Sequence, residues 1–214
     1  MDTAGETPFS PENYFIHRWI PSQDGQGVLL VLHGTGGDEN DLIPLARAVA
    51  PGAALLSLRG RVSENGMPRF FRRLAEGVFD EPDLRRQAAD MAAFLRQAAQ
   101  VYAFSPDSLY ALGYSNGANI ASAVMLLHPG VIHGALLFRS MVPLELDSLP
   151  DLSGTPVWMS SGRRDPIVPL QNAERLAQMF RQAGVQVRHL WQPGGHELAP
   201  GEIQAAADWW KENR

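Results

Sequence analysis

The feature that most constrains this chain is the motif Gly-Tyr-Ser-Asn-Gly at residues 113–117. An apolar run at residues 108–112 leads into it, and a stretch of helical composition follows at residues 118–128. A serine hydroxyl is a weak nucleophile, so a reactive serine must be held where a base can reach it. The flanking glycines suit a sharp turn because they lack a Cβ. The pattern predicts a strand, a nucleophile turn and a helix around Ser115. The alternative is a glycine-rich turn that carries a surface serine.

Apolar, strand-like runs alternate with helix-like stretches along the rest of the chain. This alternation predicts an α/β fold with a doubly wound, mostly parallel sheet and helices on both faces. Residues 59–80 and 139–155 lack this pattern and are expected to be irregular, although the first segment should be ordered. The predicted strands are 13–20, 28–32, 53–58, 108–112, 134–138, 156–160 and 185–191, and the predicted helices are 42–49, 82–102, 118–128, 169–183 and 201–210.

Length and composition favour an ordinary globular protein. With 214 residues, 45% of them hydrophobic, the chain is expected to form one domain (1–214) with a flexible segment at residues 1–11. A net charge of −5 gives no basic surface for nucleic acid or an anionic membrane. No apolar run approaches the roughly 18 residues that span a bilayer, and the polar start does not resemble a signal peptide. We therefore expect a cytoplasmic protein.

The residue types also limit the chemistry. The chain has no cysteine, which excludes disulfides, thiolate metal sites and a cysteine nucleophile. The histidines and carboxylates show no His-Glu-x-x-His or comparable spacing, so no metal site is expected.

Three reactive residues follow predicted strands: Ser115, Asp165 and His196. The carboxyl ends of parallel strands meet at one edge of a sheet, so these side chains are expected to lie close together. The order Ser, Asp, His is the order found in α/β-hydrolases. In such a triad His196 takes the proton of Ser115, while Asp165 orients the imidazole and stabilises its cation.

Other acids and histidines fit these roles less well. Asp147 and Asp151 lie in a Pro- and Leu-rich stretch before a strand, not in a loop after one. The remaining histidines lie in or next to strands, at a helix end or in a glycine-rich turn, where structural roles are more common. They are His17, His33, His128, His133 and His189.

An acyl-transfer serine also needs donors for the oxyanion. The residue after the nucleophile, Asn116, should supply one backbone N–H, and Thr35 in the turn after the 28–32 strand should supply the second. Glycine-rich turns also bind phosphates. Here, however, the turn lacks the G-x-G-x-x-G spacing and the Walker lysine, and the acidic stretch at residues 38–41 would repel a phosphate.

Together these motifs resemble the phospholipase/carboxylesterase family of α/β-hydrolases, which includes the acyl-protein thioesterases. The similar segments are 32–38, 113–117, 162–169 and 194–197. Residues 59–72 are most similar to bacterial carboxylesterases, including those linked to hydroquinone resistance. The resemblance implies a serine esterase for small or medium esters that needs no cofactor and is often a homodimer.

Departures from the thioesterases narrow the expected function. Tyr114, Asn116 and the Gly36-Gly37 pair differ from the usual thioesterase residues, which argues against protein deacylation. We expect a carboxylesterase that works through an acyl-enzyme on Ser115. The alternatives are an acyl-thioesterase or lysophospholipase with the same triad, and a small-molecule receptor on a hydrolase scaffold.

The pocket is predicted from apolar and basic residues near the motifs. Apolar candidates for an acyl or alcohol site, which could instead pack the long segment, are Met67, Phe70, Phe71, Met141 and Val142. Basic candidates for binding a substrate carboxylate, which could instead form ion pairs with nearby acids, are Arg69, Arg72 and Arg73.

Overall fold

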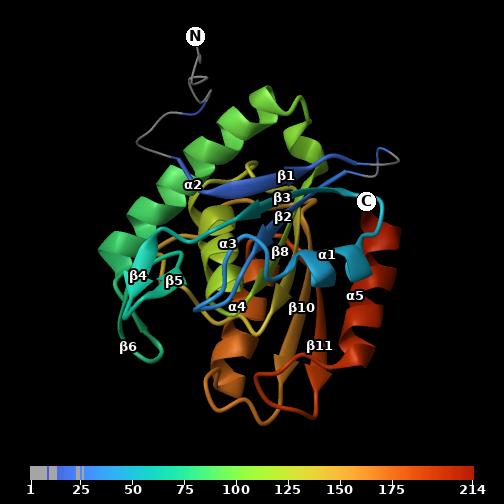
Figure 1. Ribbon diagram of the computed structural model, residues 1–214. Coiled ribbons are helices and arrows are strands. Elements are labelled where there is room, and N and C mark those ends of the chain that lie inside the picture. The colour runs from blue at the N-terminus through green and yellow to red at the C-terminus, as the bar shows by residue number, and fades with distance from the viewer. Residues whose placement is uncertain (1–8, 10–13, 23–24, 26) are drawn as a thin grey trace.

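The computed structural model describes Phe9, residues 14–22, Gly25 and residues 27–214. Its centre is a seven-stranded sheet in the order β1-β3-β2-β8-β9-β10-β11 (Figure 1). The first strand is antiparallel to β3, and the other neighbours pair in parallel. The strands are β1 (His17–Ile20), β2 (Val28–Leu32), β3 (Ala54–Leu58), β8 (Leu109–Tyr114), β9 (Gly134–Phe138), β10 (Pro156–Gly162) and β11 (Gln186–Gln192).

Helices cover both faces of this sheet. One face carries α2 (Glu81–Val101), α3 (Asn116–Leu127) and α4 (Leu170–Gln182), and the other carries α1 (Ile43–Val49) and α5 (Pro200–Asn213). Alternate residues of β2 divide between the two layers, because successive side chains of a strand point to opposite faces. The predicted doubly wound, mostly parallel α/β fold is confirmed.

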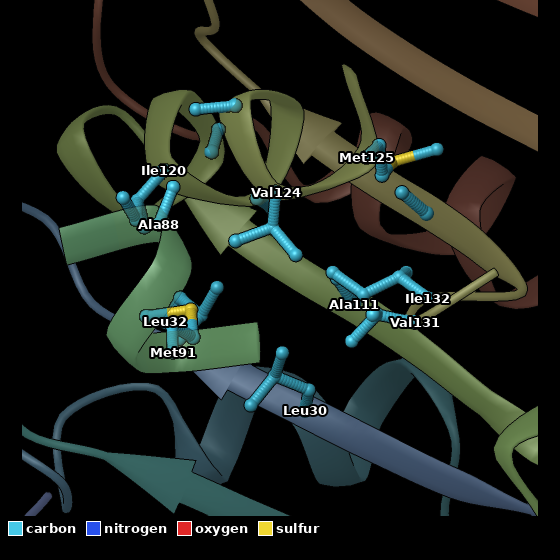
Figure 2. Close-up of a cluster of buried hydrophobic side chains, with 14 of the residues drawn as sticks. Leu30, Leu32, Ala88, Met91, Ala111, Ile120, Val124, Met125, Val131 and Ile132 are labelled. Carbon is cyan, nitrogen blue, oxygen red and sulfur yellow. The ribbon is translucent and has the colours of Figure 1, made fainter. Parts of the chain in front are cut away.

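The larger hydrophobic layer lies between α2, α3 and the sheet. Leu30 of β2, Met91 of α2 and Val124 of α3 meet there and are fully buried (Figure 2). Burying one such side chain contributes roughly 1.5–3 kcal/mol. At the start of α2, Asp80 accepts a hydrogen bond from the backbone N–H of Asp83, which caps the helix.

One prediction for this part of the chain is wrong. Residues 59–80 are not irregular but form two hairpins, and the first turns at Asn65-Gly66, where φ is 52° and 82°. Asn-Gly is a strong signal for a two-residue hairpin turn, and the sequence prediction did not use it. The hairpin strands are β4 (Val62–Glu64), β5 (Met67–Arg69), β6 (Arg73–Ala75) and β7 (Val78–Phe79).

The predictions for the N-terminus fall mostly outside the described residues. Of the segment 1–11, the structure describes Phe9 alone, which is buried and stacks on Phe94 at 4.8 Å between ring centroids. The first strand begins at His17, later than the predicted Asn13, which is also outside the described residues. No helix in the described ranges is long and apolar enough to cross a membrane.

A buried histidine makes stability depend on pH. The side chain of His189 on β11 is 4% exposed, and its Nε2 lies 2.9 Å from Ser161 Oγ. Burial lowers the pKa of His189 from 6.5 to about 4. Between these values the unfolded chain binds a proton that the folded chain does not, so stability falls as the pH drops from 6.5 towards 4.

We predict that the shifted pKa of His189 lowers the free energy of unfolding by about 2–3 kcal/mol as the pH falls from 6.5 to 4. His189→Gln, which keeps a hydrogen-bonding side chain but cannot gain a charge, should lose correspondingly less stability on acidification. Urea denaturation at pH 7 and pH 4.5 measures the difference. Equal losses in wild type and variant would contradict the prediction.

Candidate active site

The turn that carries Ser115 is tightly built. It joins β8 to α3, and Ser115 has φ 53° and ψ −113°, a conformation that is strained for a residue with a side chain. The Ser115 N–H donates to the carbonyl of Phe138 at 2.9 Å. A Cβ on Gly117 would lie 2.1 Å from the Leu32 carbonyl oxygen, so α3 can approach β2 only with glycine at this position.

The structure brings the three predicted triad side chains together. His196 Nε2 lies 3.0 Å from Ser115 Oγ, and His196 Nδ1 lies 2.8 Å from Asp165 Oδ2. The Asp165 side chain is buried, and its other carboxylate oxygen accepts hydrogen bonds from the backbone N–H groups of Ile167 and Val168. A carboxylate at Nδ1 favours the tautomer that leaves Nε2 free to accept a proton from the serine.

The rival residues have other partners. Asp151 accepts a hydrogen bond from the Ser153 backbone N–H, and His17 bonds to Tyr102 Oη. His33 Nδ1 lies 2.6 Å from the Gly34 carbonyl oxygen, and its Nε2 accepts the N–H of Gly60 at 2.9 Å. Burial lowers the pKa of His33, in keeping with a neutral ring that organises the turn after β2.

The backbone around His196 is held by two residues that the sequence analysis did not identify as site residues. Tyr114 Oη donates to the His196 carbonyl at 2.9 Å. The Arg139 guanidinium donates to the carbonyls on either side, to Gly195 at 3.0 Å and to Glu197 at 2.5 Å. Three successive carbonyl groups are therefore fixed, which sets the position of the imidazole between them.

Arg139 is itself held by a buried ion pair. Its two terminal nitrogens donate to the two carboxylate oxygens of Glu202 at 2.7 and 2.8 Å, and both side chains are fully buried. Ser160 Oγ accepts a further hydrogen bond from Arg139 at 3.0 Å. Glu202 lies in the first turn of α5, so this pair ties the His196 loop to the final helix.

The two predicted oxyanion donors lie beside Ser115. Asn116 is the first residue of α3, where helices leave backbone N–H groups unpaired, and Thr35 lies in the turn after β2. The segment after β3 fixes both residues. Arg69 donates to Thr35 Oγ1 at 2.6 Å, and the Phe70 N–H donates to Asn116 Oδ1 at 2.7 Å. The Gly36 N–H donates to the Pro68 carbonyl at 3.0 Å.

A cavity of about 400 Å³ contains Ser115 and His196 in its wall. Thr35 and Asn116 also line it, as do three of the predicted pocket residues, Met67, Arg69 and Met141.

The other pocket predictions need correction. Phe70 and Phe71 are fully buried in the core and do not line this cavity: Phe70 packs on His33 and Phe71 on Phe79. Val142 also lies away from the cavity wall and packs against the core. Arg72 is exposed and pairs with Asp80, whereas Arg73 lines the cavity.

Comparison with known proteins agrees with this architecture. The family model described as Phospholipase/Carboxylesterase matches residues 19–213. The chain belongs to the phospholipase/carboxylesterase family. It is therefore a hydrolase of the carboxylesterase type, as the resemblance of its motifs predicted.

Individual relatives cover nearly all of this family member. MhqD of Bacillus subtilis (strain 168) is 45% identical over 185 residues, which are 86% of this chain and 92% of MhqD. The Bacillus cereus carboxylesterase structure is 43% identical with a TM-score of 0.90, covering 92% of this chain and 94% of that one. YahD, solved with malic acid, is 28% identical with a TM-score of 0.89, covering 94% of this chain and all of its own.

We predict that substitutions of Arg139 and Glu202 have non-additive effects on the free energy of unfolding. Arg139→Met leaves a buried carboxylate unpaired and should cost about 3–5 kcal/mol. The double variant Arg139→Met/Glu202→Leu removes both charges and should be more stable than Arg139→Met alone. Urea denaturation of the wild type, both single variants and the double variant measures the coupling. Additive losses would contradict the prediction.

Proposed function

We propose that this protein is a serine carboxylesterase that hydrolyses small to medium carboxylic esters through an acyl-enzyme on Ser115. The observation that carries the proposal is the hydrogen-bonded series from Ser115 Oγ to His196 (3.0 Å) and from His196 to Asp165 (2.8 Å) at the wall of a cavity. This series has the geometry of a nucleophile, a general base and a residue that orients the base.

In the first half of the reaction, Ser115 Oγ attacks the ester carbonyl carbon while His196 Nε2 takes the hydroxyl proton. The negative charge that develops on the carbonyl oxygen is stabilised by the backbone N–H groups of Thr35 and Asn116 and by the positive end of α3. The carbon–oxygen bond to the alcohol then breaks, and His196 returns its proton to the leaving alcohol. The acyl group remains on Ser115.

Water completes the cycle by the same route. His196 Nε2 takes a proton from a water molecule, whose oxygen attacks the acyl carbon. The same two N–H groups stabilise the second tetrahedral intermediate. The bond between the acyl carbon and Ser115 Oγ then breaks as His196 returns the proton to Ser115 Oγ, and the carboxylic acid is released. Asp165 stabilises the imidazolium in both halves without leaving Nδ1.

The size of the cavity supports small or medium substrates. A volume of about 400 Å³ lies in the range of ordinary small-molecule sites. YahD was solved with malic acid, a small polar molecule, and we take this as support for substrates of similar size and polarity here.

A chromogenic ester series from acetyl to dodecanoyl tests the proposal. We expect wild type to turn over the short esters fastest, because a long chain would extend beyond the cavity. Ser115→Ala should lower kcat by at least about 10⁴-fold while the protein remains folded by circular dichroism. Turnover by Ser115→Ala that survives repurification would contradict the nucleophile assignment.

Other outcomes separate the alternatives. A preference for long acyl chains would favour an acyl-thioesterase or lysophospholipase that uses the same triad. A single turnover with retained product, in place of sustained hydrolysis, would favour a small-molecule receptor on the hydrolase scaffold.

A further inference from the structure

The cavity wall holds two arginines that share one carboxylate. Arg69 on β5 and Arg73 on β6 both line the cavity. The Glu64 carboxylate lies between them, 3.2 Å from Arg69 Nε and 2.9 Å from Arg73 Nε. Glu64 is not itself a lining residue, and the carboxylate that does line the cavity, Glu76, is exposed and therefore well solvated. The two cations share one partly exposed counter-charge, Glu64, which leaves an excess positive charge at this wall.

Of the two arginines, Arg69 is the one whose positive charge is shielded from water. Its side chain is only 4% exposed, and its remaining hydrogen bonds go to Thr35 Oγ1 and to the Phe71 carbonyl, which are neutral acceptors. Burial, and then the nearby charge of Arg73, lowers the pKa of the Arg69 guanidinium. A buried cation that is not fully neutralised is costly, and a bound anion would relieve that cost.

A further unused donor lies at the same wall. The Asn116 side chain is buried, and its Oδ1 accepts the Phe70 N–H, which fixes the orientation of the amide. The Nδ2 group then has no hydrogen-bond partner among the described residues. Buried polar atoms are normally paired, so an unpaired donor in a residue that lines a cavity indicates an acceptor on the ligand.

We propose that the preferred substrate is an ester that also carries a carboxylate, such as a half-ester of a small dicarboxylic acid, and that Arg69 and Arg73 bind this carboxylate. The inference rests on the proposed esterase function and assigns its substrate class. Planar guanidinium groups match a carboxylate through paired, charge-assisted hydrogen bonds. Because Arg69 also contacts Thr35, a carboxylate bound there lies next to the turn that receives the ester carbonyl.

Monoethyl succinate and ethyl succinamate form a matched pair for the test, because the second replaces the free carboxylate by a neutral amide of similar size. Ethanol release from each gives kcat/KM. Wild type should prefer the anionic ester by at least about tenfold, the lower range for hydrogen bonds to charged groups. Arg73→Gln and Arg69→Gln should each reduce this ratio by about tenfold, and raised salt should reduce it in wild type.

Arg72→Gln is the matched control. Arg72 lies next to Arg73 in sequence, but its side chain is 64% exposed, it pairs with Asp80, and it does not line the cavity. This variant removes the same charge from the same segment and should keep the wild-type ratio. A general loss of attraction for anions would instead lower the ratio equally in the Arg72 and Arg73 variants, which would overturn the inference.

The ratio separates this inference from the proposed function. Because Arg69 also positions Thr35, its variant should slow both esters, but only carboxylate binding changes their ratio. If wild type hydrolyses neutral chromogenic esters but shows no preference for monoethyl succinate, or does not hydrolyse it, the substrate class is wrong and the esterase function stands. If wild type hydrolyses no ester, the proposed function itself fails. An unchanged ratio in both Arg69→Gln and Arg73→Gln would also overturn the assignment.

Discussion

The site depends first on the close approach of α3 to the carboxyl end of β2. A Cβ on Gly117, two positions after the strained Ser115, would overlap the carbonyls of Leu32 and His33, so α3 can pack this close to β2 only with glycine there. The same approach brings the first N–H of α3 beside the turn that contains Thr35. One steric constraint therefore exposes the serine and assembles the candidate oxyanion donors next to it.

A second constraint fixes the position of His196. His196 lies in a loop after β11, and loops are usually the most mobile parts of a fold. Here the fully buried Arg139–Glu202 pair supplies two donors to the carbonyls of that loop, and Tyr114 supplies a third. Replacing a buried ion pair by apolar residues often stabilises a protein, so stability alone gives little reason to retain it. The contacts of Arg139 with the loop give another reason to retain the pair, because they position His196.

The sequence predicted the parts of this molecule in which local pattern and tertiary structure agree. The strand at 28–32 and the strand at 134–138 have the predicted bounds, and the family assignment from the motifs is confirmed. The hairpins within 59–80 were missed because strands of two or three residues carry no periodic signal and because the Asn65-Gly66 turn signal was not used. Arg139 could not be recognised, since its role comes from Glu202, 63 residues away. Phe70 and Phe71 were misplaced because an apolar pair fits a pocket or the core equally well.

The missed segment supplies the arginines to which we assign substrate specificity, whereas other elements hold the candidate triad. The sheet, α3 and the loops after β10 and β11 hold Ser115, His196 and Asp165, and none of these elements contributes Arg69 or Arg73. Those arginines come from the two hairpins, and residues 68–70 bond to Gly36, Thr35 and Asn116 of the scaffold. Changes at hairpin positions that do not contact Thr35 or Asn116, such as Arg73, can therefore alter the charge and shape of the cavity while Ser115, His196 and Asp165 keep their positions. The sheet therefore positions the candidate triad, and the two hairpins supply the arginines that we propose to select the substrate.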